Sequence, residues 1–199
     1  MRLAHVAVRL AACLCAERYL SCRCSRVGCA VPVCSRAGAT IFFKPASVDE
    51  LIDWFAMIIE PAPETPFYFY DIPGMTGVSL DTAEFLRRGR ERLPSLVGVK
   101  FTNPDQGLLR ECMQVEDGSF DLLFGTDEKL LEGLAIGCRG AVGSSYNFAA
   151  NIYHQILKAH EAGDLEVAEA WQGRSIQVIR IIAAHGYLPA AKIVMRMIG

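Results

Sequence analysis

The stretch SLVGVKFT, residues 95–102, decides the fold class because it reads as a short apolar strand that carries a lysine. Strand alternation predicts two faces, with Gly98, Lys100 and Thr102 on one and Val97, Val99 and Phe101 on the other. A charged lysine is costly to remove from water. Burial would favour the neutral amine, which attacks a ketone or aldehyde to form a Schiff base. The alternative is a lysine that reaches solvent or pairs with an acid.

Apolar runs of this kind alternate with helical patterns along the chain. The expected strands lie in residues 38–45, 67–74, 95–102, 120–128 and 140–147. Between them, Ser47 with Glu50 and Asp81 with Glu84 carry helix-start signals, and the chain is helical almost to its end from Phe148. This order predicts an α/β fold with parallel strands and crossover helices. An open doubly wound sheet and a (β/α)8 barrel both fit, and no G-x-G-x-x-G supports a dinucleotide-binding fold.

Composition narrows the function classes. The 199 residues are 52% hydrophobic and carry a net charge of −2, so a sizeable core is expected. The sequence has no basic stripe of the kind that binds nucleic acid, and it has no run of about 18 apolar residues that would span a membrane.

The N-terminal segment has a different character. Six of the eight cysteines fall between Cys13 and Cys34, among arginines and a single acid, Glu17. Their spacings fit a zinc site poorly, since no C-x2-C is present, whereas the Arg-rich, acid-poor composition fits a transit peptide. We favour a third interpretation, in which residues 1–39 are an unassigned segment outside the fold and residues 40–199 form the domain.

Polar side chains follow the other expected strands at the same end. Tyr70 could move a proton there or could simply belong to the core. Asp127 and Glu128, after Gly125, could accept hydrogen bonds from a polyol or could cap the following helix. Ser144 adds a hydroxyl after the last strand. The repeated position of these residues on consecutive strands is the signal for a site.

Four motifs in this order give a resemblance to a known family. They are Tyr70, Asp71, Ile72, Pro73, Thr76 and Gly77; then Gly98, Lys100 and Thr102; then Gly125, Asp127 and Glu128; then Gly143, Ser144, Ser145, Tyr146 and Asn147. From about Thr40 to Gly199 the chain resembles the pyruvate-dependent class I aldolases, which include N-acetylneuraminate lyase and dihydrodipicolinate synthase. The turn after Tyr70 lacks the arginine expected in the synthase branch, so the lyase branch fits better.

The resemblance implies a function. Lys100 would form a Schiff base with the pyruvate portion of sialic acid, Tyr70 would relay the proton, and Thr102 would orient the substrate. The hydroxylated tail would be held by Gly125, Asp127, Glu128 and Ser144. The lyase would cleave N-acetylneuraminate to N-acetylmannosamine and pyruvate without a metal or added cofactor. Family members are cytoplasmic homotetramers of TIM barrels, which act on small molecules.

Two departures from the family shape the remaining expectations. First, residues 1–39 hold no G-S-T turn to bind the substrate carboxylate. Second, a TIM barrel takes about 250 residues, whereas only residues 40–199 of this chain resemble one. The five strands would therefore be the fourth to eighth of an incomplete barrel, arising from a fragment, a splice form or a gene-model error. The strands in residues 38–45 and 140–147 would then have unpaired edges, and the chain alone would have little activity. The alternatives are a non-catalytic truncated paralogue or partner of the lyase tetramer, and a pyruvate aldolase for another sugar acid.

Overall fold

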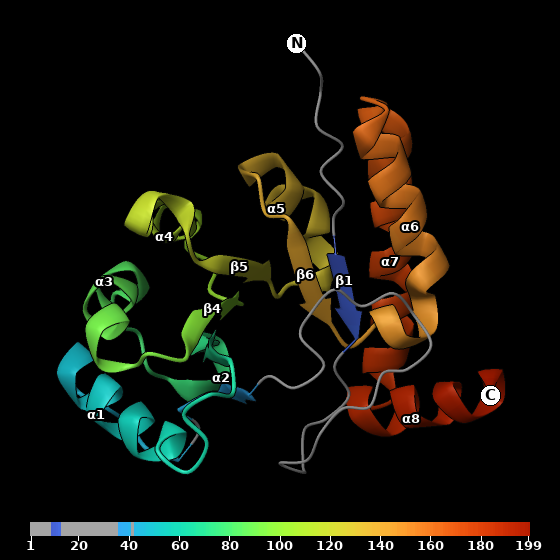
Figure 1. Cartoon of the computed structure of the whole chain (residues 1–199). Helices are drawn as coiled ribbons and strands as arrows, with labels where there is room; N and C mark the ends of the chain where they lie inside the picture. The colour runs from blue at the N-terminus through green and yellow to red at the C-terminus, as the bar shows by residue number, and fades with distance from the viewer. Residues whose placement is uncertain (1–8, 13–35, 41) are drawn as a thin grey trace. The chain divides into compact units, whose positions relative to one another are not determined.

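The computed structural model describes residues 9–12, 36–40 and 42–199 (Figure 1). The cysteine-rich segment, with its zinc and transit-peptide interpretations, lies outside these residues. The described residues divide into two compact units. One ends at Leu123, and the other joins Phe124–Gly199 to a short strand near the N-terminus.

The unit that ends at Leu123 is built on parallel strands. In spatial order they are β2 (Arg36–Gly38), β3 (Phe67–Asp71), β4 (Leu96–Phe101) and β5 (Asp121–Phe124), which lies at the boundary of the unit. The pairs β2–β3 and β3–β4 are both parallel. This arrangement confirms the crossover connections that the alternating pattern predicts, since helices link successive parallel strands.

Helices connect these strands. They are α1 (Val48–Ile59), α2 (Pro73–Thr76), α3 (Thr82–Arg92) and α4 (Gln106–Cys112), and the 3₁₀ turn η1 (Val115–Gly118) precedes β5.

The starts of α1 and α3 follow the predicted capping signals. The Ser47 hydroxyl accepts a hydrogen bond from the amide of Glu50 at 3.2 Å, and the Glu50 carboxylate accepts one from the amide of Ala46 at 2.9 Å. At the second start, the Asp81 carboxylate accepts from the amide of Glu84 at 2.8 Å. These side chains satisfy amides that the first helical turn leaves unpaired.

Aromatic rings pack α1 and α3 against the sheet. The ring of Phe55 in α1 lies 4.8 Å from that of Phe67 in β3, between ring centroids, and Phe69 lies 4.8 Å from Phe85 in α3. Phe55 and Phe85 have no exposed surface. Alternation along β3 therefore turns Phe67 and Phe69 toward the helices and leaves its tyrosines for the other face.

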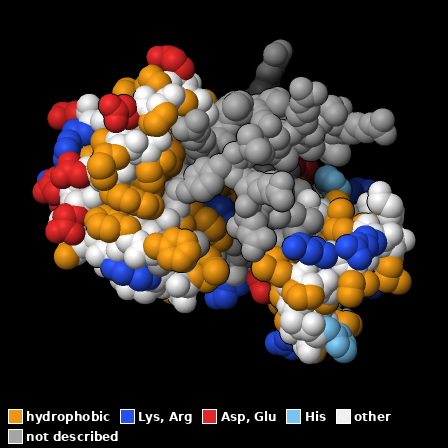
Figure 2. All heavy atoms as spheres, turned by 90° about the horizontal axis from the view of Figure 1, so that it is seen from below, with side chains coloured by type: hydrophobic (Ala, Val, Ile, Leu, Met, Phe, Trp, Pro, Cys, Tyr) orange, Lys and Arg blue, Asp and Glu red, His pale blue; other side chains and the backbone are white. Residues whose placement is uncertain are grey.

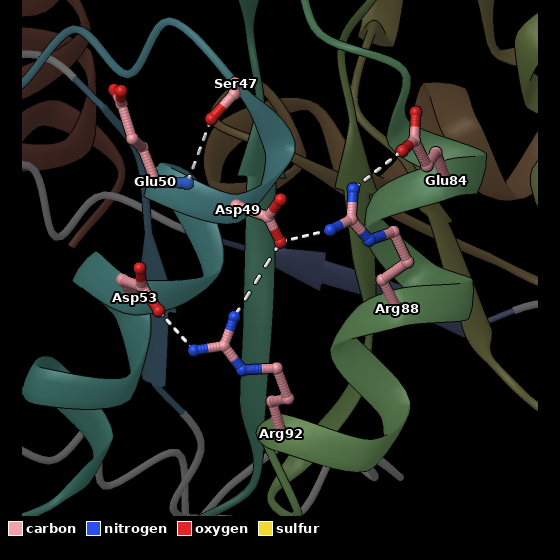
Figure 3. A network of polar contacts seen from close by, with 7 residues as sticks. All are labelled: Ser47, Asp49, Glu50, Asp53, Glu84, Arg88 and Arg92. Atoms are coloured by element: carbon pink, nitrogen blue, oxygen red, sulfur yellow. Dashed lines mark hydrogen bonds and ion pairs between the residues drawn. The ribbon is translucent and has the colours of Figure 1, made fainter.

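Ion pairs join the outer faces of α1 and α3 (Figure 3). Arg88 pairs with Asp49 and, at 2.9 Å, with Glu84; Arg92 pairs with Asp53 and lies 3.8 Å from Asp49. All five side chains are about half exposed. Water screens such pairs, so they fix the relative register of the two helices more than they add to stability.

The second unit contains a pair of parallel strands. β6 (Gly140–Gly143) pairs residue for residue with β1 (Arg9–Ala12). This pairing corrects two expectations. Residues 1–39 are not without strand structure, and β6 does not present an open edge, because β1 occupies it.

The helices of this unit follow the sequence closely. The 3₁₀ turn η2 (Asp127–Lys129) leads into α5 (Leu130–Ile136), and α6 (Tyr146–Glu161), α7 (Leu165–Ala184) and α8 (Tyr187–Ile198) complete the chain. Breaks between the last three helices occur at Gly163 and Gly186, where φ is +76° and +78°. Glycine adopts this left-handed backbone without strain, which explains the predicted interruptions.

The helix α8 contributes little to the core of its unit, since only Ala191 of its residues is buried. Apolar side chains are visible on the surface at the right of Figure 2. The large apolar side chains of α7 and α8 that are exposed are those of Leu165, Val167, Ile181, Leu188, Ile193, Met197 and Ile198. Among the described residues, no single helix is long and apolar enough to span a membrane; α7 and α8 meet that standard only together, across a bend of 111°.

The first expected strand is displaced. The sequence predicts it in residues 38–45, but the strand is β2, Arg36–Gly38. Phe42 is 96% exposed, and the ring of Phe43 stacks on Trp54 at 5.4 Å instead of joining the sheet. Gly38 explains the shift, because a Cβ at this position would lie 2.8 Å from the Phe55 ring. A strand can approach the aromatic core this closely only with glycine at that position.

Candidate functional site

The seven predicted site residues form two groups, one in each unit. Lys100, Tyr70 and Thr102 lie at the carboxyl ends of β3 and β4. The other four, Gly125, Asp127, Glu128 and Ser144, follow β5 and β6.

The lysine and the tyrosine of the first group are direct neighbours. Tyr70 and Lys100 are register partners on the parallel pair β3–β4. The Nζ atom of Lys100 lies 3.9 Å from the centroid of the Tyr70 ring. Both side chains are half-buried, so they retain access to solvent at the edge of the sheet. The arrangement places an amine beside a phenol, which are a nucleophile and a group that can carry a proton.

Gly98, two residues before the lysine, allows close packing on the same face of the sheet. A Cβ at Gly98 would lie 2.0 Å from the backbone oxygen of Asp121 and 3.0 Å from the Tyr68 ring. The Tyr68 hydroxyl donates to the Asp121 carboxylate at 2.8 Å. The face of the sheet that carries Lys100 is therefore polar next to the lysine, and it is close-packed at the glycine.

Thr102 brings an unused hydroxyl to the same strand end. Its amide donates to the carbonyl oxygen of Asp71 at 2.8 Å, which extends the β3–β4 ladder by one residue. Its Oγ1 is buried and has no hydrogen-bond partner within the described part of the chain. A buried hydroxyl without a partner is costly, so this atom suits a role in binding a ligand.

In the second group, the carboxylate of Asp127 is held by the residue that follows Ser144. Oδ2 of Asp127 accepts from the amide of Ser145 at 3.0 Å and also from its hydroxyl. The hydroxyl of Ser145 is 2.6 Å from that of Tyr153 in α6. A Cβ at Gly143 would lie 2.4 Å from the Asp127 carboxyl carbon, so glycine is required there. Asp127 is 8% exposed and does not cap a helix, in contrast to one of the sequence interpretations.

A cavity of about 280 Å³ opens beside this group. Its lining residues are Asp127, Glu128, Ser144, Ile179, Ala183 and Tyr187. The hydroxyls of Ser144 and Tyr187 are 2.7 Å apart, and either one can be the donor. Burial raises the pKa of Tyr187, and the hydrogen bond from Ser144 opposes that shift. The phenol therefore stays protonated at neutral pH, and the cavity offers hydroxyls and carboxylates to a ligand.

Sequence reasoning missed two residues of this site. Tyr187 begins α8, and its stretch HGYLP was read only as a helix break. Gln172 in α7 is buried; its Nε2 donates to the backbone oxygen of Asp127 at 3.1 Å, and its Oε1 accepts from the amide of Leu131. The available signal for Gln172 was its place, with Ser175, among the apolar residues of the buried face of α7. No local signal existed for Tyr187, since its partner lies 43 residues away.

Among the described residues, no three His, Cys, Asp or Glu side chains are arranged to hold a metal ion.

The strands β2 to β6 are parallel neighbours in their order along the chain, and the candidate side chains lie at the carboxyl ends of the strands, which is the arrangement found in β/α-barrel proteins. The chain belongs to the dihydrodipicolinate synthetase family, whose sequence profile matches residues 37–199. This result confirms the resemblance predicted from the four motifs.

Relatives and solved structures agree with this assignment. The chain is 39% identical over 150 residues to N-acetylneuraminate lyase of Gallus gallus, covering 75% of this chain and 49% of the relative. Its structure is similar to that of the N-acetylneuraminate lyase (sialic acid aldolase) of Aliivibrio salmonicida, with a TM-score of 0.77 and 38% identity over 82% of this chain and 55% of that one. The structure is also similar to that of the Proteus mirabilis N-acetylneuraminate lyase, with a TM-score of 0.76 and 36% sequence identity. That match covers 80% of this chain and 54% of the Proteus mirabilis chain. The chain thus spans about half the length of these relatives, and the predicted fold class, part of a (β/α)8 barrel, is confirmed.

Proposed function

We propose that this chain carries the Schiff-base chemistry of an N-acetylneuraminate lyase, which cleaves sialic acid reversibly to N-acetylmannosamine and pyruvate. The observation that carries the proposal is the contact between the Lys100 amine and the Tyr70 ring at neighbouring strand ends. The relatives named N-acetylneuraminate lyase, at up to 41% identity, support the choice of substrate.

The chemistry assigns a role to each residue of the first group. The neutral amine of Lys100 attacks the keto carbon of the sugar acid, water leaves, and a protonated imine forms. The bond between the carbon next to the imine carbon and the following carbon, which bears a hydroxyl, then breaks. Its electron pair moves toward the imine nitrogen to give an enamine. Tyr70 relays the proton of the hydroxyl on the departing carbon: it accepts this proton and passes its own phenol proton to the enamine carbon, and the departing carbon becomes the aldehyde. Protonation of the enamine and hydrolysis of the imine release pyruvate and the free amine.

The remaining candidates bind and orient the substrate. The unpartnered hydroxyl of Thr102 would donate to the pyruvate portion of the imine. Glu128, Ser144 and Asp127 line the cavity of the second group, so they would bind the hydroxylated tail. The resemblance to the family adds Gly125 to this set.

The proposal extends to the assembly and the domain. The partial-barrel aldolase domain would be residues 40–199 together with β2, which the family match over residues 37–199 supports. The resemblance also leads us to propose a cytoplasmic homotetramer that needs no metal or cofactor and acts on sialic acid and pyruvate.

Trapping with borohydride tests the proposal. The chain is incubated with pyruvate and reduced, and the peptides are mapped by mass spectrometry. We expect a stable adduct on Lys100, and none in Lys100→Arg, since a guanidinium does not act as an amine nucleophile. Lys44→Arg, which changes another lysine of the same unit, should leave the adduct unchanged. Modification at a different lysine would contradict the assignment of Lys100, and a folded chain with no adduct would favour the non-catalytic alternative.

A further inference from the structure

The carboxylate of Asp71 is buried directly behind the proposed catalytic pair. Asp71 follows Tyr70 at the end of β3, and alternation turns its side chain to the opposite face of the sheet. It is only 4% exposed. Its Oδ2 accepts two hydrogen bonds, from the Thr82 hydroxyl at 2.9 Å and from the side-chain amide of Asn103 at 3.1 Å. A charged group in such a place needs partners of this kind, because burial alone disfavours it.

The two donors belong to the starts of two helices. Thr82 is the first residue of α3, and Asn103 precedes α4. Asn103 is itself held, since its side-chain oxygen accepts from the amide of Asp105, the N-cap of α4. Asp71 thus joins the end of β3 to the positions from which α3 and α4 begin.

Asp71 also accepts hydrogen bonds from the two residues that follow β4, just after Lys100. Its backbone oxygen accepts from the amide of Thr102, and its side chain accepts from Asn103. Two successive residues past the end of β4 are therefore tied to one residue of β3. Lys100 is the last residue but one of β4, and Tyr70 is the last but one of β3. Any fraying of either strand end would move the amine and the phenol apart.

We propose that Asp71 is a positioning residue, which holds Tyr70 against Lys100 by tying Asn103 and Thr82 to the end of β3. The catalytic part of this inference rests on the proposed function, but the positioning itself does not. A role in folding alone would leave the Tyr70–Lys100 contact intact in variants that remain folded. A measurement of the Tyr70–Lys100 contact in folded variants therefore distinguishes a positioning role of Asp71 from a role in folding alone.

Nuclear magnetic resonance can report the contact without any reaction. Lysines are reductively methylated with ¹³C-formaldehyde, which keeps their charge, and the Lys100 signal is assigned by its loss in Lys100→Arg. A methyl group so near an aromatic ring centroid has a ring-current shift. The chain with Tyr70→Leu defines the signal of Lys100 without its ring. We expect Asp71→Asn and Asn103→Ala to move the signal most of the way to that reference, while the signal of Lys44 stays in place.

A second arm measures the rate of borohydride-trapped pyruvate adduct on Lys100. Displacement of reacting groups by about 1 Å can cost up to about 10²-fold in rate, so a loss of at least about tenfold is expected in both variants. The double variant should lose no more than the single ones, because both remove the same tie. Asp53→Asn, an exposed acid of the same unit, serves as the control and should trap at the wild-type rate.

The outcomes are distinct. An unmoved Lys100 signal in folded Asp71→Asn or Asn103→Ala overturns the positioning role, whatever the trapping shows. A moved signal in a chain that pyruvate never modifies supports the positioning role and refutes the proposed function. Asn103 is only partly buried, so Asn103→Ala carries the test if Asp71→Asn does not fold.

Discussion

Replacing Gly98 by alanine probes the close approach of β4 to β5. The added Cβ would lie 2.0 Å from the backbone oxygen of Asp121, whereas such contacts are not shorter than 3.0 Å in real proteins. The strands would have to separate by about 1 Å, which is the difference between these distances. Hydrogen bonds between strands weaken steeply over such an increase. The oxygen belongs to the backbone of a neighbouring strand, so no side-chain rotation relieves the contact.

The magnitude follows from the bonds that this separation weakens. Each backbone hydrogen bond contributes a net of about 0.5–1.5 kcal/mol, and overpacked core positions cost about 1–3 kcal/mol. We therefore expect Gly98→Ala to lower the free energy of unfolding by about 2 kcal/mol, measured by urea titration followed by circular dichroism. Gly74→Ala is the matched control, because a Cβ there meets nothing within 4 Å. If Gly98→Ala is as stable as Gly74→Ala, the close approach of the strands is refuted.

Three further predictions concern Tyr70, Asp127 and Asp71. In the lyase reaction, Tyr70→Phe keeps the ring over Lys100 but should lower kcat by about 10²–10⁴-fold with little change in pyruvate binding; equal turnover would make Tyr70 a packing residue. Asp127→Asn should raise KM for the sugar acid while pyruvate trapping remains, and loss of trapping in the folded variant would instead assign it to supporting the pocket. Burial raises the pKa of Asp71 above its ordinary 3.8, and the hydrogen bonds from Asn103 and Thr82 oppose this shift. The contribution of Asp71 to the stability of the fold is therefore present below pH 3.8 and is lost as the pH rises through the pKa of Asp71 in the folded protein. Asp71→Asn should abolish this component of the pH dependence of unfolding and Glu64→Gln should not; a profile that Asp71→Asn leaves unchanged would contradict it.

Local signals predicted the elements well where they were strong. The capping residues Ser47 and Asp81 mark the starts of α1 and α3 because their side chains bond amides within the next three residues. The strand with Lys100 was also predicted with its faces correct: Val99 and Phe101 are buried, and Lys100 lies beside Tyr70. In each case the deciding interaction lies within a few residues or follows from alternation.

Predictions failed where the deciding contact is distant in sequence. The apolar run in residues 38–45 looked like a strand, yet pairing with β3 and the proximity of Gly38 to the Phe55 ring select residues 36–38. The pairing of β1 with β6 spans most of the chain and leaves no periodic signature in four residues. Likewise, the Asp71–Asn103 bond joins residues 32 apart, so no spacing rule could have found it.

The hydroxyl pair of Ser144 and Tyr187 has a consequence for discrimination among ligands. The two groups already satisfy each other at 2.7 Å, so a ligand hydroxyl that enters the cavity exchanges one hydrogen bond for another. Such an exchange is close to neutral in free energy, and a ligand that lacks the hydroxyl leaves the protein pair intact. The cavity therefore tolerates loss of a hydroxyl at this point. A stricter preference requires Glu128, because carboxylate oxygens accept hydrogen bonds and do not donate them.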